Sequence, residues 1–165
     1  PDGSLRIAKQ RGVTAITNVL RSESVGDIHI KSTNPADPPA IRFNFMTSRY
    51  DQDGTVAGVR KVRELFSTGP LADVVGAELA PGPSIQTDEE ILAWIRKNAE
   101  TTSHPVGTCK MGSDPMAVVD DNLKVHGIDR LRVADASIMP TLTSGNTNAP
   151  SIMIGEKCAE MMLAS

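Results

Sequence analysis

The sequence predicts an α+β fold, with a mostly antiparallel β-sheet and flanking helices. Apolar and polar residues alternate in two segments between residues 26 and 45, which indicates neighbouring strands. Apolar residues then recur at three- and four-residue steps between residues 51 and 66, which indicates an amphipathic helix. The length of 165 residues is the ordinary size of one domain. The aromatic content of 3% is low, so the core should consist mainly of aliphatic side chains. We therefore expect a single domain over residues 1–165.

The two alternating segments have the pattern of an antiparallel pair. Residues 26–32 and 41–45 alternate, and the stretch between them, residues 34–39, is rich in turn-forming Asn, Asp and Pro. Because every second side chain of a strand points to the same face, the pair should bury one apolar face. That face would consist of Ile28, Ile30, Ile41, Phe43 and Phe45.

The middle of the chain predicts two helices. The first covers residues 51–66 and ends before Gly69 and Pro70. The second starts at Thr87 and Glu90, which have the spacing of a capping box, and runs to about Asn98. Its buried side would be formed by Ile91, Leu92, Trp94 and Ile95.

The last third of the chain predicts short strands followed by a helix. Residues 117–119 and 131–134 are strand candidates separated by turn-forming residues. Asn148 can cap the final helix, and Pro150 fits its first turn. A broad apolar surface of this helix would comprise Ile152, Met153, Cys158, Ala159, Met161 and Met162.

Charge and cysteine content exclude several classes of protein. The 17 basic and 20 acidic residues are interspersed, so the chain lacks the basic stripe of a nucleic-acid-binding protein. No apolar run approaches the roughly 20 residues of a transmembrane helix. Cys109 and Cys158 have no metal-ligand spacing, so we expect reduced thiols, no metal site and a cytoplasmic protein.

Residues 1–3 are turn-forming, which favours a sequence that starts inside a longer polypeptide.

Polar residues with catalytic potential concentrate in two segments, at residues 104–108 and 144–150. Pro105 disfavours a helical conformation of His104 and so predicts a loop. A loop histidine can act as a general base near neutral pH. A structural histidine is the alternative, and for His104 taken alone it is the stronger one.

The second segment places side-chain amides at the start of the final helix, where the helix dipole contributes about half a positive charge. Such a helix start can stabilise developing negative charge. A capping role explains Asn148, whereas Asn146 lies before the helix and has no such structural explanation. Asp135 and Ala136 end a strand candidate, where a ligand phosphate can approach the backbone; a structural turn is the alternative.

The order of these segments closely resembles the C-terminal region of the glucose–methanol–choline (GMC) oxidoreductases, and among them the choline dehydrogenase-like branch. The similarity rests on HPVGTCKMG at 104–112, LRVADASIMP at 131–140, NTNAP at 146–150 and MIGE at 153–156. It implies the fold of the family's substrate-binding domain. It also implies a flavoenzyme that oxidises the CH–OH group of a small alcohol to an aldehyde or ketone, with hydride passing to flavin N5.

The resemblance also implies roles for single residues. His104 would accept the hydroxyl proton, and Asn146 would orient the alcohol oxygen. Residues 131–165 would pack on the FAD domain. The implied FAD contacts are Asp135 and Ala136 at the phosphates, and the backbone of Thr147 and Asn148 at the flavin pyrimidine.

The family's dinucleotide-binding motif, Gly-x-Gly-x-x-Gly, does not occur in the 165 residues. We therefore expect a truncated fragment that lacks the Rossmann half and needs the N-terminal FAD-binding region of the same polypeptide as its partner. Alone, it should bind FAD weakly or not at all and be inactive. A hydroxynitrile lyase-like enzyme and a non-catalytic domain derived from the family remain alternatives, and the substrate, the electron acceptor and the oligomeric state stay open.

Overall fold

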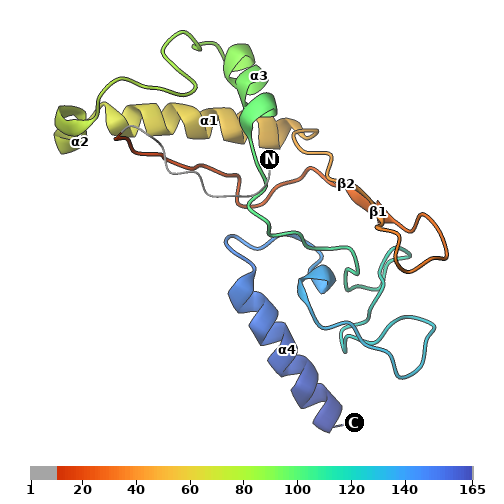
Figure 1. Cartoon of the computed structure of the whole chain (residues 1–165). Coiled ribbons are helices and arrows are strands. Elements are labelled where there is room, and N and C mark those ends of the chain that lie inside the picture. The colour runs from red at the N-terminus through yellow and green to blue at the C-terminus, as the bar shows by residue number, and fades with distance from the viewer. Residues whose placement is uncertain (1–10, 165) are drawn as a thin grey trace. The chain divides into compact units, whose positions relative to one another are not determined.

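The computed structural model describes residues 11–164, and within them it contains a two-stranded antiparallel sheet and four α-helices (Figure 1). This is the α+β class that the sequence predicts. The turn expected at residues 1–3 lies outside the described residues. In chain order the elements are β1 (Asp27–His29), β2 (Ala40–Arg42), α1 (Arg49–Phe66), α2 (Gly69–Val74), α3 (Asp88–Asn98), a single 3-10 turn η1 (Ala136–Ile138) and α4 (Asn148–Leu163).

The described chain forms two compact units. One contains residues 11–18 and 52–98, and with them α2, α3 and most of α1. The other contains residues 19–51 and 99–164, and with them the sheet, η1 and α4. A single domain over residues 1–165 stays a prediction.

The strand pair forms where the sequence predicts it, with Ile28 opposite Ile41 in an antiparallel register. Gly26 makes the close approach possible, because a Cβ atom there would lie 2.0 Å from the carbonyl oxygen of Arg42. The Arg42 side chain also donates a hydrogen bond to Asp27, with 3.1 Å between Nε and Oδ1. Only glycine therefore fits beside the start of β1.

The prediction that this strand pair buries one apolar face is wrong. All five predicted residues are exposed, and Ile30 retains 88% of its accessible surface. Each strand is only three residues long, and a two-stranded ribbon buries a face only when another layer covers it. The exposed residues are Ile28, Ile30, Ile41, Phe43 and Phe45, of which the two phenylalanine rings stack on each other with centroids 4.9 Å apart.

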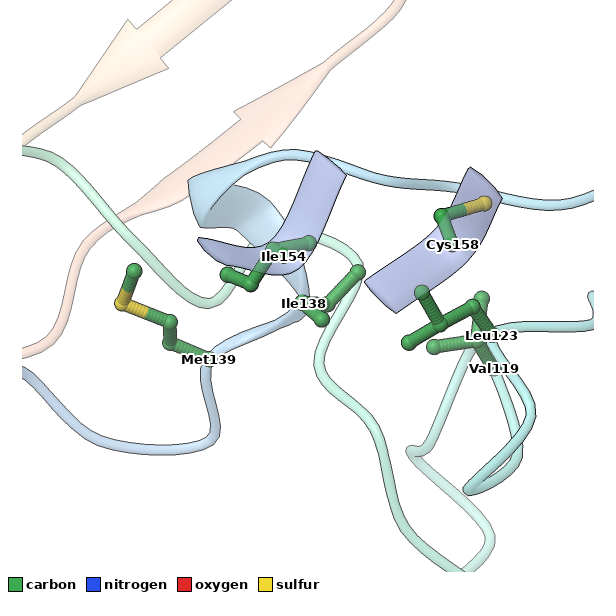
Figure 2. Close-up of a cluster of buried hydrophobic side chains, with 6 residues drawn as sticks. All are labelled: Val119, Leu123, Ile138, Met139, Ile154 and Cys158. Carbon is green, nitrogen blue, oxygen red and sulfur yellow. The ribbon is translucent and has the colours of Figure 1, made fainter. Parts of the chain in front are cut away.

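A cluster of aliphatic and sulfur-containing side chains forms the core of the unit that contains α4 (Figure 2). Its buried members are Val119, Leu123, Ile138, Met139, Ile154 and Cys158. The strand candidates at 117–119 and 131–134 are reduced to single bridges here: Val119 pairs with Met111 and with Val125, and Lys124 pairs with Arg132. These loops are therefore held by the core and by isolated backbone contacts.

Helix α4 begins at the predicted place, but its cap differs from the prediction. Thr147 occupies the N-cap position, so Asn148 is the first helical residue and does not cap the helix. Pro150 lies in the first turn, as expected. Ile154 and Cys158 are buried, whereas Ile152, Met153 and Met162 are exposed. Among the helices of residues 11–164, none combines the length and apolarity needed to cross a membrane.

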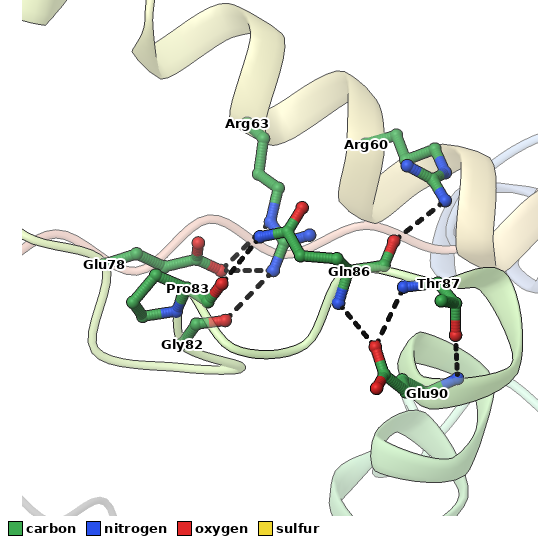
Figure 3. Close-up of polar contacts among 8 residues, drawn as sticks. All are labelled: Arg60, Arg63, Glu78, Gly82, Pro83, Gln86, Thr87 and Glu90. Carbon is green, nitrogen blue, oxygen red and sulfur yellow. Dashed lines mark hydrogen bonds and ion pairs between the residues drawn. The ribbon is translucent and has the colours of Figure 1, made fainter.

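In the other unit, α3 starts with the predicted capping box (Figure 3). The Thr87 N–H donates to the Glu90 carboxylate at 2.9 Å, and the Glu90 N–H donates to the Thr87 hydroxyl at 3.2 Å. Ile91 and Ile95 are buried. Helix α1 starts at Arg49, two residues before the predicted position, and its Arg63 binds the Glu78 carboxylate at 3.0 Å.

Candidate active site

The loop that carries His104 is anchored to η1 by main-chain hydrogen bonds. The N–H of Cys109 donates to the carbonyl of Ser137 at 3.0 Å, and the N–H of Met111 donates to that of Ile138 at 2.8 Å. Val106, two residues after His104, packs against the buried cluster of Figure 2. The loop that carries His104 is therefore held in two ways, by main-chain hydrogen bonds to η1 and by packing of Val106 against the core.

The loop before α4 is fixed at both ends. Ser144 accepts a hydrogen bond from the Arg21 side chain, with 2.7 Å between Nε and Oγ. Four residues before Thr147, the Thr143 hydroxyl donates to the Gly145 carbonyl at 3.3 Å. At the other end, Ile154 places α4 in the core. Asn146 lies between these anchors and is exposed, so its amide can reach a ligand.

The two predicted segments meet at one hydrogen bond. The Nδ1 atom of His104 lies 3.2 Å from the Oγ1 atom of Thr147. His104 is half-buried, and Thr147 is only 7% exposed. The structure thus joins His104 to the residue next to Asn146, across 43 positions of sequence.

The Asp135 carboxylate has a structural partner. It accepts a hydrogen bond from the Ser137 N–H at 2.8 Å and another from the Ser137 hydroxyl, and so caps η1. Ala136 packs against the buried cluster. The carboxylate therefore stabilises the turn that supports the His104 loop, which agrees with the structural alternative. A contact of the Asp135 and Ala136 backbone with a ligand stays a prediction.

Sequence reasoning missed the side chain of Thr147. The family resemblance implied a backbone role only for this residue, and the sequence predicted Asn148 as the cap of the helix. The available signal was the presence of two cap-forming residue types in a row, Thr147 and Asn148, since only one of them can occupy the N-cap position. Within residues 11–164, no group of three or more His, Cys, Asp or Glu side chains could hold a metal ion.

Known proteins resemble the chain over most of its length. The family described as GMC oxidoreductase matches residues 22–155. The oxygen-dependent choline dehydrogenase of Citrobacter koseri is 47% identical over 152 residues, which are 92% of this chain and 27% of that protein. The chain thus spans little more than a quarter of the curated relatives it matches.

Two solved structures resemble its fold. Pyridoxine 4-oxidase from Mesorbium loti superposes with a TM-score of 0.83 at 32% identity, over 88% of this chain and 28% of that one. An FAD-dependent oxidoreductase from Chaetomium thermophilum has a TM-score of 0.76 at 37% identity, over 83% of this chain and 24% of the other.

Proposed function

The chain belongs to the GMC oxidoreductase family, and from this premise we propose that it forms the C-terminal, substrate-side part of an FAD-dependent alcohol oxidoreductase. The reaction would convert the CH–OH group of a small alcohol to an aldehyde or ketone. One observation carries the proposal: the hydrogen bond between His104 and Thr147 brings a loop histidine to the start of α4. The name of the choline dehydrogenase relative supports an alcohol substrate.

The start of α4 supports a contact with the electron-rich edge of a flavin. Thr147 gives the helix no side-chain cap, so the N–H groups of Asn148 and Ala149 find no acceptor in that side chain. Free N–H groups at a helix start favour a partner that carries negative charge. Asn148 and the backbone of Thr147 would therefore contact the flavin pyrimidine, and the backbone of Asp135 and Ala136 would lie near the phosphates.

FAD, when bound, supplies the hydride acceptor of the reaction. The sequence lacks Gly-x-Gly-x-x-Gly, so we propose that the main FAD anchor is an N-terminal region of the same polypeptide. This division agrees with the quarter of each curated relative that the chain spans. The partners of this chain would then be that region and the alcohol.

The chain itself would handle the proton of the alcohol. Neutral His104 takes the hydroxyl proton, which develops negative charge on the alcohol oxygen. Asn146, which is exposed and adjacent to Thr147, has an amide that can donate a hydrogen bond to that oxygen. Proton removal and orientation of the alcohol would thus come from two loops held on one core.

Replacement of His104 in the flavin-loaded, full-length enzyme tests this function, with choline as the first alcohol. His104→Ala should lower kcat/KM by about 10² to 10⁴, the range for a general base, and leave the flavin content unchanged. His29→Ala is the matched control, because the His29 side chain is 68% exposed in the strand pair. Normal turnover by His104→Ala would refute the assignment.

We also propose that the protein is cytoplasmic and does not bind nucleic acid. Cys109 and Cys158 are both free thiols, which supports a reducing compartment. The net charge of −3 supports the second statement. Fractionation of the source cells tests the location.

A further inference from the structure

Thr147 occupies the N-cap of α4 but does not cap it. A capping threonine has an extended backbone, and its hydroxyl accepts a hydrogen bond from an N–H in the first turn. Thr147 instead has φ −88° and ψ 0°, which is helical, and its side chain makes no cap hydrogen bond. Its hydroxyl lies 3.2 Å from Nδ1 of His104. The side chain that could serve the helix therefore serves the histidine.

We propose that Thr147 is a positioning residue that fixes the tautomer and the orientation of His104. Its Oγ1 accepts a hydrogen bond from Nδ1–H, which leaves the lone pair of Nε2 to take the alcohol proton. This inference rests on the proposed function, because it assigns a base that the function requires. The inference goes beyond that function because it names Thr147 as the residue that selects Nε2 of His104 as the basic nitrogen.

The chemistry of imidazole gives this contact its consequence. A neutral imidazole carries hydrogen on one ring nitrogen and a lone pair on the other, and a partner at one nitrogen selects the tautomer. Thr147 contacts Nδ1, so Nε2 is the nitrogen left for a substrate. If Nε2 carried the hydrogen, His104 would donate a hydrogen bond there and could not act as a base.

Packing and hydrogen bonds support this contact from both sides. Val106 ties the His104 loop to the buried cluster, and Ile154 ties α4 to the same cluster. The backbone of Thr147 is fixed as well, since its carbonyl accepts from the Ser151 N–H at 3.0 Å and from the Ser151 hydroxyl at 2.6 Å. Thr147 as a whole residue is 7% exposed, so little water competes for its hydrogen bond to His104.

The kinetic test uses the flavin-loaded, full-length enzyme with choline. Thr147→Val keeps the shape and removes the hydroxyl; loss of one hydrogen bond should lower kcat by about 5- to 10-fold with little change in KM. Thr147→Ser should restore most of kcat. Thr68→Val is the matched control, because that hydroxyl donates to the carbonyls of Glu64 and Leu65 in the other compact unit. Wild-type kcat in Thr147→Val would overturn the inference.

The second test does not depend on turnover. In enzyme labelled with ¹⁵N-histidine, the His104 signals are assigned by their loss in His104→Ala, and the nitrogen chemical shifts report the tautomer. The Nδ1–H form is expected in the wild type, with a shift toward Nε2–H in Thr147→Val. An Nε2–H wild type overturns the inference even if Thr147→Val fails to fold.

The two proposals fail in different ways. If His104→Ala turns over normally, the proposed function is wrong. If His104→Ala is inactive while Thr147→Val matches the wild type in kcat and tautomer, only the role of Thr147 is wrong.

Discussion

Nδ1 of His104 lies 3.2 Å from Oγ1 of Thr147, although 43 positions separate the two residues in sequence. The contact exists because one apolar cluster holds both segments, through Val106 on one side and Ile154 on the other. The geometry of the candidate site and the packing of the core are therefore linked in this part of the chain. Substitutions outside this cluster should therefore lower the stability of the fold more than they change the contact between His104 and Thr147.

Gly26 should be intolerant of any side chain. In Gly26→Ala the new Cβ would overlap the carbonyl oxygen of Arg42, 2.0 Å away, and forcing atoms into a packed position costs about 1–3 kcal/mol. Faster hydrogen exchange in β1 and a lower Tm of the full-length protein are expected. Gly76→Ala is the matched control, since nothing lies within 4 Å of its added Cβ. Unchanged exchange in Gly26→Ala would show that the strand pair is not formed.

Asp51 should be a stability determinant. Its carboxylate, in a residue 3% exposed, accepts hydrogen bonds from the Ser22 hydroxyl at 2.7 Å and from the N–H groups of Glu23 and Ser24 at 3.0 and 2.7 Å. Asp51→Asn puts an N–H donor among these donors, at a cost of about 1–3 kcal/mol. The exchange of the Glu23 and Ser24 amides should accelerate, whereas exposed Asp121→Asn should leave it unchanged.

The same carboxylate predicts a pH dependence. Burial raises the pKa of Asp51, but hydrogen bonds from Ser24, Ser22 and Glu23 outweigh burial and hold the pKa below the ordinary value of 3.8. The ionised form therefore stabilises the fold above the unfolded-state pKa, and this stability is lost as pH falls through the lower folded-state pKa. Protection factors of the Glu23 and Ser24 amides should hold at pH 5 and fall on acidification below that range. Loss of protection already near neutral pH would contradict the sign.

Residues 1–165 produced alone should bind FAD weakly or not at all and should not oxidise choline. The physical reason is the missing Gly-x-Gly-x-x-Gly turn, whose backbone holds the pyrophosphate in dinucleotide-binding folds. Titration of the purified 165-residue chain with FAD, followed by flavin fluorescence, measures this. A yellow, active preparation would disprove the prediction.

Local signals predicted three of the four α-helices in residues 11–164, whereas α2 (Gly69–Val74) was not predicted, because Gly69 and Pro70 indicated only the end of the preceding helix. The capping box of Thr87 and Glu90 forms as predicted, and Pro150 lies in the first turn of α4. Such features depend on residues within one or two turns, so a single sequence contains the information they need.

Features that depend on distant partners were not predictable. The alternation around Ile30 located the strand pair but not its burial, because burial requires a covering layer from elsewhere. The cap of α4 was assigned to Asn148 although Thr147 occupies it, and the Thr147 side chain is engaged by His104 from another loop. The sequence predicted a candidate site made of two segments, but the hydrogen bond between His104 and Thr147 depends on the packing of Val106 and Ile154.

Anaerobic reduction of the flavin by an alcohol tests the central claim most directly. The full-length, flavin-loaded enzyme is mixed with choline in the absence of oxygen, and the flavin absorbance is followed for the wild type and His104→Ala. The wild-type flavin should bleach, and the variant should bleach about 10² to 10⁴ times more slowly. Equal rates in the two proteins would contradict the role of His104, and a wild-type flavin that no alcohol bleaches would indicate a lyase-like or non-catalytic member of the family.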